Sequence, residues 1–134
     1  MKNATRILVV DDFPYVRSGL RTMLESRDDW EVIGEAGDGE QGLAQAKHFQ
    51  PDIAVVDIRM PKMNGLTLTR EIRRLLPKVK VLIVTDHDSR HMRKAAQSAG
   101  AHGYIVKSEV GSRLLAAVQA LSERRVFFTS NEEG

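Results

Sequence analysis

Ile53-Ala54-Val55-Val56-Asp57 is the stretch of sequence that decides the fold. Its first four residues are apolar and consecutive, which is typical of a strand covered on both faces. A similar run, Arg6-Ile7-Leu8-Val9-Val10, is also followed by acids, Asp11 and Asp12. Strands covered on both faces are typical of parallel sheets, whose carboxyl ends lie along one edge. Both acidic strand ends are therefore expected at the same edge of one sheet.

Three further runs extend this pattern along the chain. They are Trp30–Glu35, Val79–Val84 and Gly103–Val106. The first of them alternates polar and apolar residues, so it is expected at an edge of the sheet.

Five segments between and after these runs have apolar residues at helical spacing. They are Val16–Leu24, Leu43–Phe49, Leu68–Leu76, Met92–Ala99 and Leu114–Leu121. Pro14 suits the first turn of the first helix, Asn64 can cap the third, and Pro77 can end it. Five strands alternating with five helices predict an α/β fold, a doubly wound five-stranded parallel sheet with right-handed crossovers.

The composition indicates a soluble globular domain. Of 134 residues, 42% are hydrophobic and 28% are charged, which is an ordinary balance. The absence of cysteine excludes disulfides and thiolate metal sites and suits a reducing compartment. The net charge of +2 is small and spread along the chain, so it gives no indication of nucleic-acid binding. No apolar stretch resembles a membrane span or a signal peptide, so we expect no membrane association.

Polar residues follow the carboxyl ends of four predicted strands, where doubly wound sheets bind ligands. They are Asp11, Asp12, Asp57, Thr85, Asp86 and Lys107. Two unscreened carboxylates about 4 Å apart repel by roughly 4 kcal/mol at an effective dielectric constant of 20. Three carboxylates in one cleft therefore need a cation, a proton or a lysine close by. Oxygen ligands without cysteine or histidine favour a hard ion, and a cage open to phosphate favours Mg²⁺.

Each of these residues alone also has an ordinary structural explanation. The pair Asp11-Asp12 is compatible with a turn or a helix cap, and Asp57 with a helix entry. Lys107 alone would be a solvated lysine at a strand end, and Thr85 an ordinary strand residue. Their joint placement at the ends of neighbouring strands favours one functional cleft.

Four short motifs lie at the predicted strand ends in a distinctive order. They are Leu8–Asp12, Asp57–Pro61 with Asn64-Gly65, Leu82–Thr85, and Tyr104–Ser108. With these motifs the sequence resembles, over residues 5 to about 124, the receiver domain of two-component response regulators. The resemblance implies a flavodoxin-like, receiver-type fold and a role in phosphorelay signal transduction.

The resemblance implies a role for each acid of the cleft. Asp57 would accept a phosphoryl group from a sensor histidine kinase and also contact Mg²⁺. Asp12 would bind Mg²⁺ directly, Asp11 mainly through water, and the backbone carbonyl of Arg59 would be a further ligand. The domain would catalyse only its own phosphorylation and dephosphorylation, so it would not be an enzyme acting on other substrates.

The resemblance also implies a switch. Lys107 and Thr85 would bind the phosphoryl oxygens, and Tyr104 would fill the space that Thr85 vacates when it turns. This movement would shift an existing equilibrium between two surfaces around the fourth helix, fifth strand and fifth helix. A homodimer would form through this surface or through the first and fifth helices.

Asp86 and His87 follow the switch threonine and are expected to modulate the site, because receivers usually carry a small residue after that threonine. Asp86 could face the cleft and slow the approach of an anionic phosphodonor by charge repulsion. Alternatively, it could cap the helix that begins near Asp88 and Ser89. The first hypothesis predicts faster phosphorylation of Asp86→Ala, and the second predicts only lower thermal stability.

The end of the chain resembles regulators that continue into a helix-turn-helix DNA-binding domain. Ser108 follows Lys107, where many receivers have proline, and the tail from Arg124 resembles the start of a linker. We expect a receiver domain over residues 1–124 and a tail or linker over residues 125–134. DNA would be contacted only through an output domain outside this chain. The alternative is a stand-alone, single-domain regulator. A cytoplasmic location and transcription regulation follow from the same resemblance.

Three other interpretations remain open. An aspartyl phosphohydrolase would resemble Asp-x-Asp after the first strand, whereas here Asp57-Ile58-Arg59 follows the third strand and lacks the second acid. A nucleotide or flavin site would need a glycine-rich loop where the chain reads Asp11-Asp12-Phe13-Pro14. A receiver-like docking module that is never phosphorylated would keep the fold without the chemistry, although here all the motif residues are present.

Overall fold

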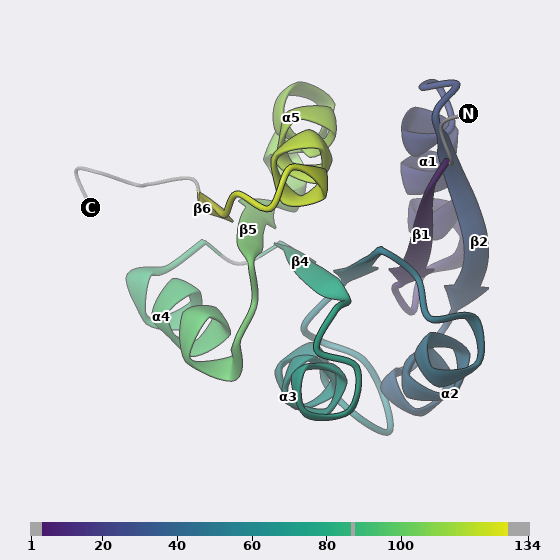
Figure 1. The fold of residues 1–134 in the computed structure, drawn as a ribbon. Helices are drawn as coiled ribbons and strands as arrows, with labels where there is room; N and C mark the ends of the chain where they lie inside the picture. Colours follow the sequence, from purple (N-terminus) through teal and green to yellow (C-terminus); the bar gives the residue numbers. More distant parts are fainter. Residues whose placement is uncertain (1–3, 87, 129–134) are drawn as a thin grey trace.

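One parallel sheet runs through the molecule (Figure 1). The computed structural model describes residues 4–86 and 88–128. The strands lie in the order β2-β1-β3-β4-β5-β6, and neighbouring strands are parallel. They are β1 (Thr5–Val10), β2 (Trp30–Ala36), β3 (Ile53–Val56), β4 (Lys80–Thr85), β5 (Gly103–Val106) and β6 (Phe127–Phe128).

Helices cover both faces of the sheet, with α1 and α5 on one face and α2, α3 and α4 on the other (Figure 1). They are α1 (Pro14–Leu24), α2 (Gly39–Phe49), α3 (Gly65–Leu75), α4 (Arg90–Ala99) and α5 (Val110–Ser122). A 3₁₀ turn, η1 (Lys107–Glu109), leads from β5 into α5. This is the doubly wound α/β architecture predicted from the alternation of runs. Within the described ranges, no helix is long and apolar enough to cross a bilayer.

The helix ends follow local signals in the sequence. Pro14 is the first residue of α1, and the Asn64 side chain accepts hydrogen bonds from the N–H groups of Leu66 and Thr67 at the start of α3. Gly100 ends α4 in the left-handed conformation, with φ of 99°. The predicted starts of α1 and α3 are therefore confirmed.

Two apolar clusters, one on each face of the sheet, form the core. Alternate side chains of a strand point to opposite faces, so the central strands contribute to both clusters. In β1, Leu8 and Val10 pack toward α2, α3 and α4, whereas Ile7 and Val9 pack toward α1 and α5. This packing on both faces holds the carboxyl ends of the central strands, and the polar residues that follow them, in fixed positions.

The two edges of the sheet confirm one prediction and correct another. β2 is an edge strand, as its alternating sequence predicted. The opposite edge is β6, so the sheet has six strands rather than the predicted five. After α5, Arg124 takes a φ of 64°, and the chain turns so that the Phe127 N–H donates to the His102 carbonyl at 2.9 Å. A strand of two residues carries too little periodic signal to be predicted from sequence.

Candidate functional site

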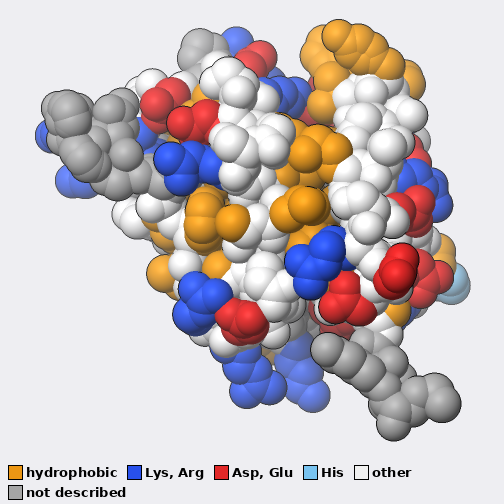
Figure 2. Space-filling model, turned by 90° about the horizontal axis from the view of Figure 1, so that it is seen from above, with side chains coloured by type: hydrophobic (Ala, Val, Ile, Leu, Met, Phe, Trp, Pro, Cys, Tyr) orange, Lys and Arg blue, Asp and Glu red, His pale blue; other side chains and the backbone are white. Residues whose placement is uncertain are grey.

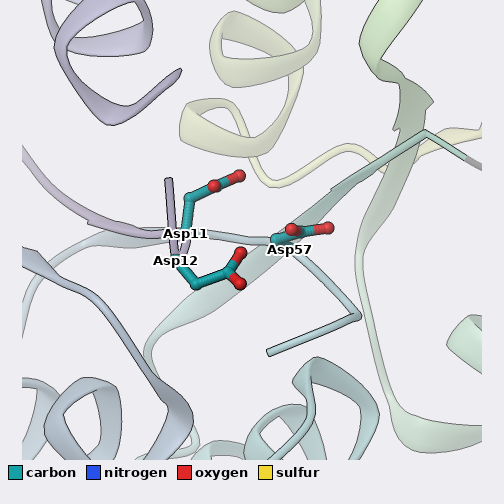
Figure 3. Close-up of side chains that lie close together, drawn as sticks. All are labelled: Asp11, Asp12 and Asp57. Carbon is teal, nitrogen blue, oxygen red and sulfur yellow. The ribbon is translucent and has the colours of Figure 1, made fainter. Parts of the chain in front are cut away.

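Three carboxylates meet at the carboxyl end of the sheet (Figure 3). Asp11 and Asp12 follow β1, and Asp57 follows the neighbouring strand β3. One carboxylate oxygen of each residue lies within 4.8 Å of the others. Asp11 and Asp57 are only 1% and 5% exposed, so water screens their charges poorly. The structure therefore brings together the three acids that the strand-end pattern predicted as one cluster, which we call the acidic cluster.

Backbone hydrogen bonds fix the directions of two of these acids. The Asp57 N–H donates to the Val10 carbonyl at 2.9 Å, and Asp57 Oδ1 accepts from the Ile58 N–H at 2.8 Å. Asp11 Oδ1 accepts from the Phe13 N–H at 2.9 Å. In both acids, Oδ2 remains for contacts within the acidic cluster.

Lys107 supplies positive charge to the acidic cluster. Its Nζ lies 2.9 Å from Asp11 Oδ2 and 3.2 Å from Asp57 Oδ2. Burial lowers the pKa of the Lys107 ammonium, but the two carboxylates outweigh burial and raise this pKa overall. Lys107 is therefore charged at neutral pH, and its ammonium bridges Asp11, which follows β1, and Asp57, which follows β3.

The Asp57 carboxyl has a raised pKa, so it ionises less readily than an ordinary aspartate. Burial raises its pKa to about 6, the neighbouring Asp11 charge adds to the increase, and Lys107 opposes it. Asp12 Oδ1 is buried and has no hydrogen-bond donor among the described residues. The acidic cluster holds three carboxyl groups, whereas Lys107 contacts only two of them, so the cluster has an excess of acidic groups. An all-oxygen cluster with this excess and a buried, unpartnered oxygen fits a hard cation, so the acidic cluster can hold a metal ion.

The two predicted switch residues lie on β4 and β5. Thr85 ends β4, and Tyr104 lies within β5; both are buried. Burial, reinforced by Asp88, raises the pKa of the Tyr104 hydroxyl, whereas Arg93 and the backbone of Ser89 oppose the increase. The Tyr104 side chain is thus already packed inside the protein, beside the loop that leads into α4. The coupled movement of Thr85 and Tyr104 stays a prediction.

The remaining predicted site residues are Arg59, Asp86 and His87. The Arg59 side chain is exposed, which is compatible with a contribution from its backbone carbonyl alone. Asp86 is also exposed, and the N-cap of α4 is Ser89, whose Oγ accepts from the Met92 N–H at 3.0 Å. The hypothesis that Asp86 caps this helix is therefore wrong, and its effect on phosphorylation stays a prediction. His87 lies outside the described residues.

Phe13 and Arg17 also contact the acidic cluster or Lys107, although the strand-end pattern does not single them out. The Phe13 side chain is 58% exposed, and Lys107 Nζ lies 5.9 Å from its ring centroid. Arg17 Nη1 donates to the Asp11 carbonyl at 2.6 Å. The one signal in the sequence is that both residues follow the acidic pair closely. Phe13 lies just before α1, and Arg17 lies in its first turn.

Removing the charge of Asp57 is expected to stabilise the domain in buffer that contains a chelator. The folded protein holds this carboxyl at a pKa of about 6 rather than its ordinary 3.8, so folding disfavours the ionised form at pH 7. A shift of about two units corresponds to at most about 3 kcal/mol, and we expect Asp57→Asn to raise the unfolding free energy by about 1–3 kcal/mol. This gain should shrink as the pH falls through about 6 and vanish near about 4, because wild-type Asp57 then becomes protonated.

Urea denaturation of both proteins at pH 7 and pH 5 measures this difference. Asp28→Asn, at an exposed loop position, is the control and should change stability by less than about 0.5 kcal/mol. Equal stabilities of wild type and Asp57→Asn at pH 7 would contradict the unfavourable ionisation of Asp57.

Similar proteins are known from sequence. Residues 7–119 match the family model of the response regulator receiver domain. The chain is 34% identical over 127 residues to YxjL, an uncharacterized transcriptional regulatory protein of Bacillus subtilis, covering 95% of this chain and 58% of YxjL. It is 38% identical over 122 residues to the response regulator GacA of Pseudomonas aeruginosa, covering 91% of this chain and 55% of GacA.

A solved structure shows the same fold. The crystal structure of a two-component response regulator of the LuxR family from Aurantimonas sp. SI85-9A1 has a TM-score of 0.91 and 34% identity, covering 97% of this chain and 92% of that chain. This chain spans a little over half the length of YxjL and GacA. It therefore belongs to the response regulator receiver domain family of two-component systems, and it matches the receiver part of relatives that are transcriptional regulators.

Proposed function

We propose that Asp57 accepts a phosphoryl group from a sensor histidine kinase, with Mg²⁺ held by Asp11, Asp12 and Asp57. The observation that supports this proposal most directly is the position of Lys107, whose Nζ contacts both Asp57 Oδ2 and Asp11 Oδ2. Asp57 Oδ1 is already held by the Ile58 N–H. Oδ2, which lies beside the Lys107 ammonium, is the oxygen that we propose forms the new bond.

In the proposed step, Asp57 Oδ2 attacks the phosphorus atom of the donor in line. A bond forms between this oxygen and phosphorus, and the bond between phosphorus and the donor atom breaks, its electron pair leaving with the donor. The product is an acyl phosphate on Asp57. The nucleophile is the ionised carboxylate, and a pKa of about 6 leaves most of Asp57 ionised at neutral pH.

The neighbouring residues are proposed to position the donor and neutralise its charge. Bound Mg²⁺ would supply charge neutralisation for the transferred phosphoryl group. Asp12 is the proposed direct ligand, Asp11 a ligand through water, and the Arg59 carbonyl a further ligand. Lys107 and the Thr85 hydroxyl are proposed to bind the phosphoryl oxygens.

Phosphorylation would change the surface through Thr85 and Tyr104. A phosphoryl group adds about 1.5 to 2 negative charges and strong hydrogen-bond acceptors. We propose that it shifts these two side chains between two arrangements, and with them the surface of α4, β5 and α5. Phe128 pairs with Tyr104 in the sheet, so β6 lies directly beside the proposed switch.

The proposed output is transcription, because YxjL and DevR/DosR of Mycobacterium tuberculosis are described as a transcriptional regulatory protein and a DNA-binding transcriptional activator. DNA would be contacted through an output domain outside this chain, in the cytoplasm. A homodimer would form through α4, β5 and α5 or through α1 and α5. Figure 2 shows hydrophobic side chains along the middle of the face that α1 and α5 cover, which supports the second surface. The domain would act on its own Asp57 and not as an enzyme on other substrates.

Acetyl phosphate, a small phosphodonor, tests the chemistry without the kinase. In excess Mg²⁺, intact-mass measurement should show one added phosphoryl group, and replacing Mg²⁺ with EDTA should abolish it. Calorimetry should show that Asp12→Ala loses more Mg²⁺ affinity than Asp11→Ala, because Asp12 is the proposed direct ligand. Equal Mg²⁺ affinity of Asp12→Ala and wild type would contradict the ligand set. A wild-type chain that is never modified would favour the unphosphorylated docking module.

A further inference from the structure

Arg17 connects the acidic cluster to the edge of the sheet. It lies in the first turn of α1, and its side chain is only 18% exposed. Nη1 donates to the backbone carbonyl of Asp11 at 2.6 Å, and Nε donates to Glu35 Oε1 at 3.2 Å. One guanidinium group therefore holds both the loop after β1 and a side chain of β2.

The Glu35 end of this connection is itself fixed. Glu35 Oε2 accepts from Arg21 Nη1 at 2.7 Å, and the Glu35 carbonyl accepts from Gln45 Nε2 at 2.7 Å. Residues from α1 and α2 thus hold Glu35 on β2 from two sides. A guanidinium that bonds to an immobilised carboxylate loses little freedom when it makes its next hydrogen bond. Arg17 is therefore suited to impose a direction on the Asp11 carbonyl.

The carbonyl that Arg17 binds belongs to the peptide group that joins Asp11 to Asp12. A peptide group is planar, so fixing its oxygen also fixes its N–H and the direction in which the chain enters Asp12. Asp12 Oδ1 is a buried oxygen that has no hydrogen-bond donor among the described residues. Among the described residues, no backbone N–H holds Asp12 Oδ1 in the way that the Phe13 N–H holds Asp11 Oδ1, so we take the orientation of Asp12 to depend on its backbone.

Arg17 also differs from Lys107 in the groups that its side chain contacts. Lys107 Nζ contacts the carboxylate oxygens of Asp11 and Asp57. Within the described part of the chain, the hydrogen bonds of the Arg17 side chain go instead to a backbone carbonyl and to Glu35. Arg17 can therefore orient the acidic cluster without occupying the oxygens that a cation would need.

We propose that Arg17 is a positioning residue that holds the Asp11–Asp12 peptide group in the orientation required for cation binding by Asp12. This inference rests on the proposed function of the acidic cluster as a Mg²⁺ site. Partners that orient metal ligands typically contribute about 10- to 100-fold to metal affinity. We expect Arg17→Met to weaken Mg²⁺ binding about tenfold, and Arg17→Lys, which keeps one cationic nitrogen in place of the two that Arg17 uses, to weaken it less.

The test measures Mg²⁺ affinity by calorimetry in wild type, Arg17→Met, Arg17→Lys and Arg21→Met. Arg21→Met is the matched control, because Arg21 also bonds to Glu35 but contacts Glu25 and the Val32 carbonyl instead of Asp11. Its Mg²⁺ affinity should stay within about twofold of wild type. The backbone amide resonance of Asp12, recorded in the presence of a chelator, should move in the Arg17 variants and stay in place in Arg21→Met.

The outcomes separate this inference from the proposed function. If wild type does not bind Mg²⁺, the proposed function fails. If wild type binds Mg²⁺ and the Arg17 variants bind it equally well with an unmoved Asp12 resonance, only the positioning role fails. An equal loss of affinity in Arg21→Met would also overturn it, because general loosening of α1 and β2 would then explain the result. If Arg17→Met does not fold, Arg17→Lys and its Asp12 resonance decide the question.

Discussion

Lys107→Met is expected to slow phosphoryl transfer from acetyl phosphate to Asp57 by about 100-fold or more at saturating Mg²⁺. Lys107 Nζ lies 3.2 Å from Asp57 Oδ2, the oxygen proposed to form the new bond. An ammonium in that position can meet the charge that develops on the phosphoryl oxygens, and removing one such donor typically costs about 10²- to 10³-fold in rate. Time-resolved intact-mass measurement gives the rate directly.

Mg²⁺ affinity separates this effect from damage to the metal site. Lys107 contacts the same Asp11 and Asp57 oxygens that a cation would approach, so Lys107→Met should bind Mg²⁺ at least as tightly as wild type. Arg113→Met, which removes an exposed cation near the start of α5, is the control and should react within about twofold of the wild-type rate. A Lys107→Met rate within about fivefold of wild type would contradict the proposed role of this lysine.

Gly65→Ala is expected to destabilise the domain by about 3 kcal/mol or more. A Cβ at this position would lie 2.0 Å from the Asp57 carbonyl oxygen and 2.9 Å from the Ile58 Cα. Both neighbours are backbone atoms, and the Gly65 N–H also donates to the Ile58 carbonyl at 2.8 Å, so relief requires moving the chain around Asp57. We therefore expect Gly65→Ala to lose Mg²⁺ affinity as well as stability. Chemical denaturation and calorimetry measure the two losses.

Gly19→Ala is the matched control for this substitution. Gly19 lies in α1, and a Cβ there would meet no heavy atom within 4 Å. Alanine is favoured over glycine in a helix interior, so Gly19→Ala should stabilise the domain by about 0.5–1 kcal/mol. A Gly65→Ala protein as stable as wild type would show that the loop after β3 can move away from α3 at little cost.

The acidic cluster could be predicted because two independent regularities coincide. Apolar runs locate the strand ends closely, since Asp11, Asp57 and Lys107 each directly follow a strand in the structure. The rule that parallel strands present their carboxyl ends along one edge then brings these residues together. Neither regularity depends on how any single side chain is oriented.

Features that depend on tertiary contacts could not be predicted in this way. β6 exists because the chain after α5 turns back onto the edge of β5, where the Phe127 N–H meets the His102 carbonyl. One hypothesis from the sequence is that Asp86 caps α4, but the structure places the cap at Ser89, whose Oγ accepts from the Met92 N–H; the side-chain geometry that decides this is not visible in the sequence. Arg17 has a long, flexible side chain, and its partner Glu35 lies on a different element, so spacing along the chain does not reveal the contact.

The exposure of Asp86 reduces the expected size of its effect on phosphorylation. The acidic group of Asp11, Asp12 and Asp57 does not include it, and its side chain is exposed to solvent. Water and salt screen exposed charges over about 8–10 Å, so repulsion of an anionic donor is weaker than for a carboxylate inside the acidic cluster. The hypothesis that Asp86 slows phosphorylation by charge repulsion still predicts faster phosphorylation of Asp86→Ala.

The intact mass of wild type and Asp57→Asn after incubation with acetyl phosphate and Mg²⁺ is the most direct test of Asp57 as the phosphoacceptor. The Asp57→Asn substitution keeps the size of the side chain and removes the carboxylate that is proposed as the nucleophile, and a folded variant is expected from the stability prediction above. We predict one added phosphoryl group on wild type and none on Asp57→Asn. Persistent single-site labelling of Asp57→Asn, to the same extent as wild type, would contradict this assignment.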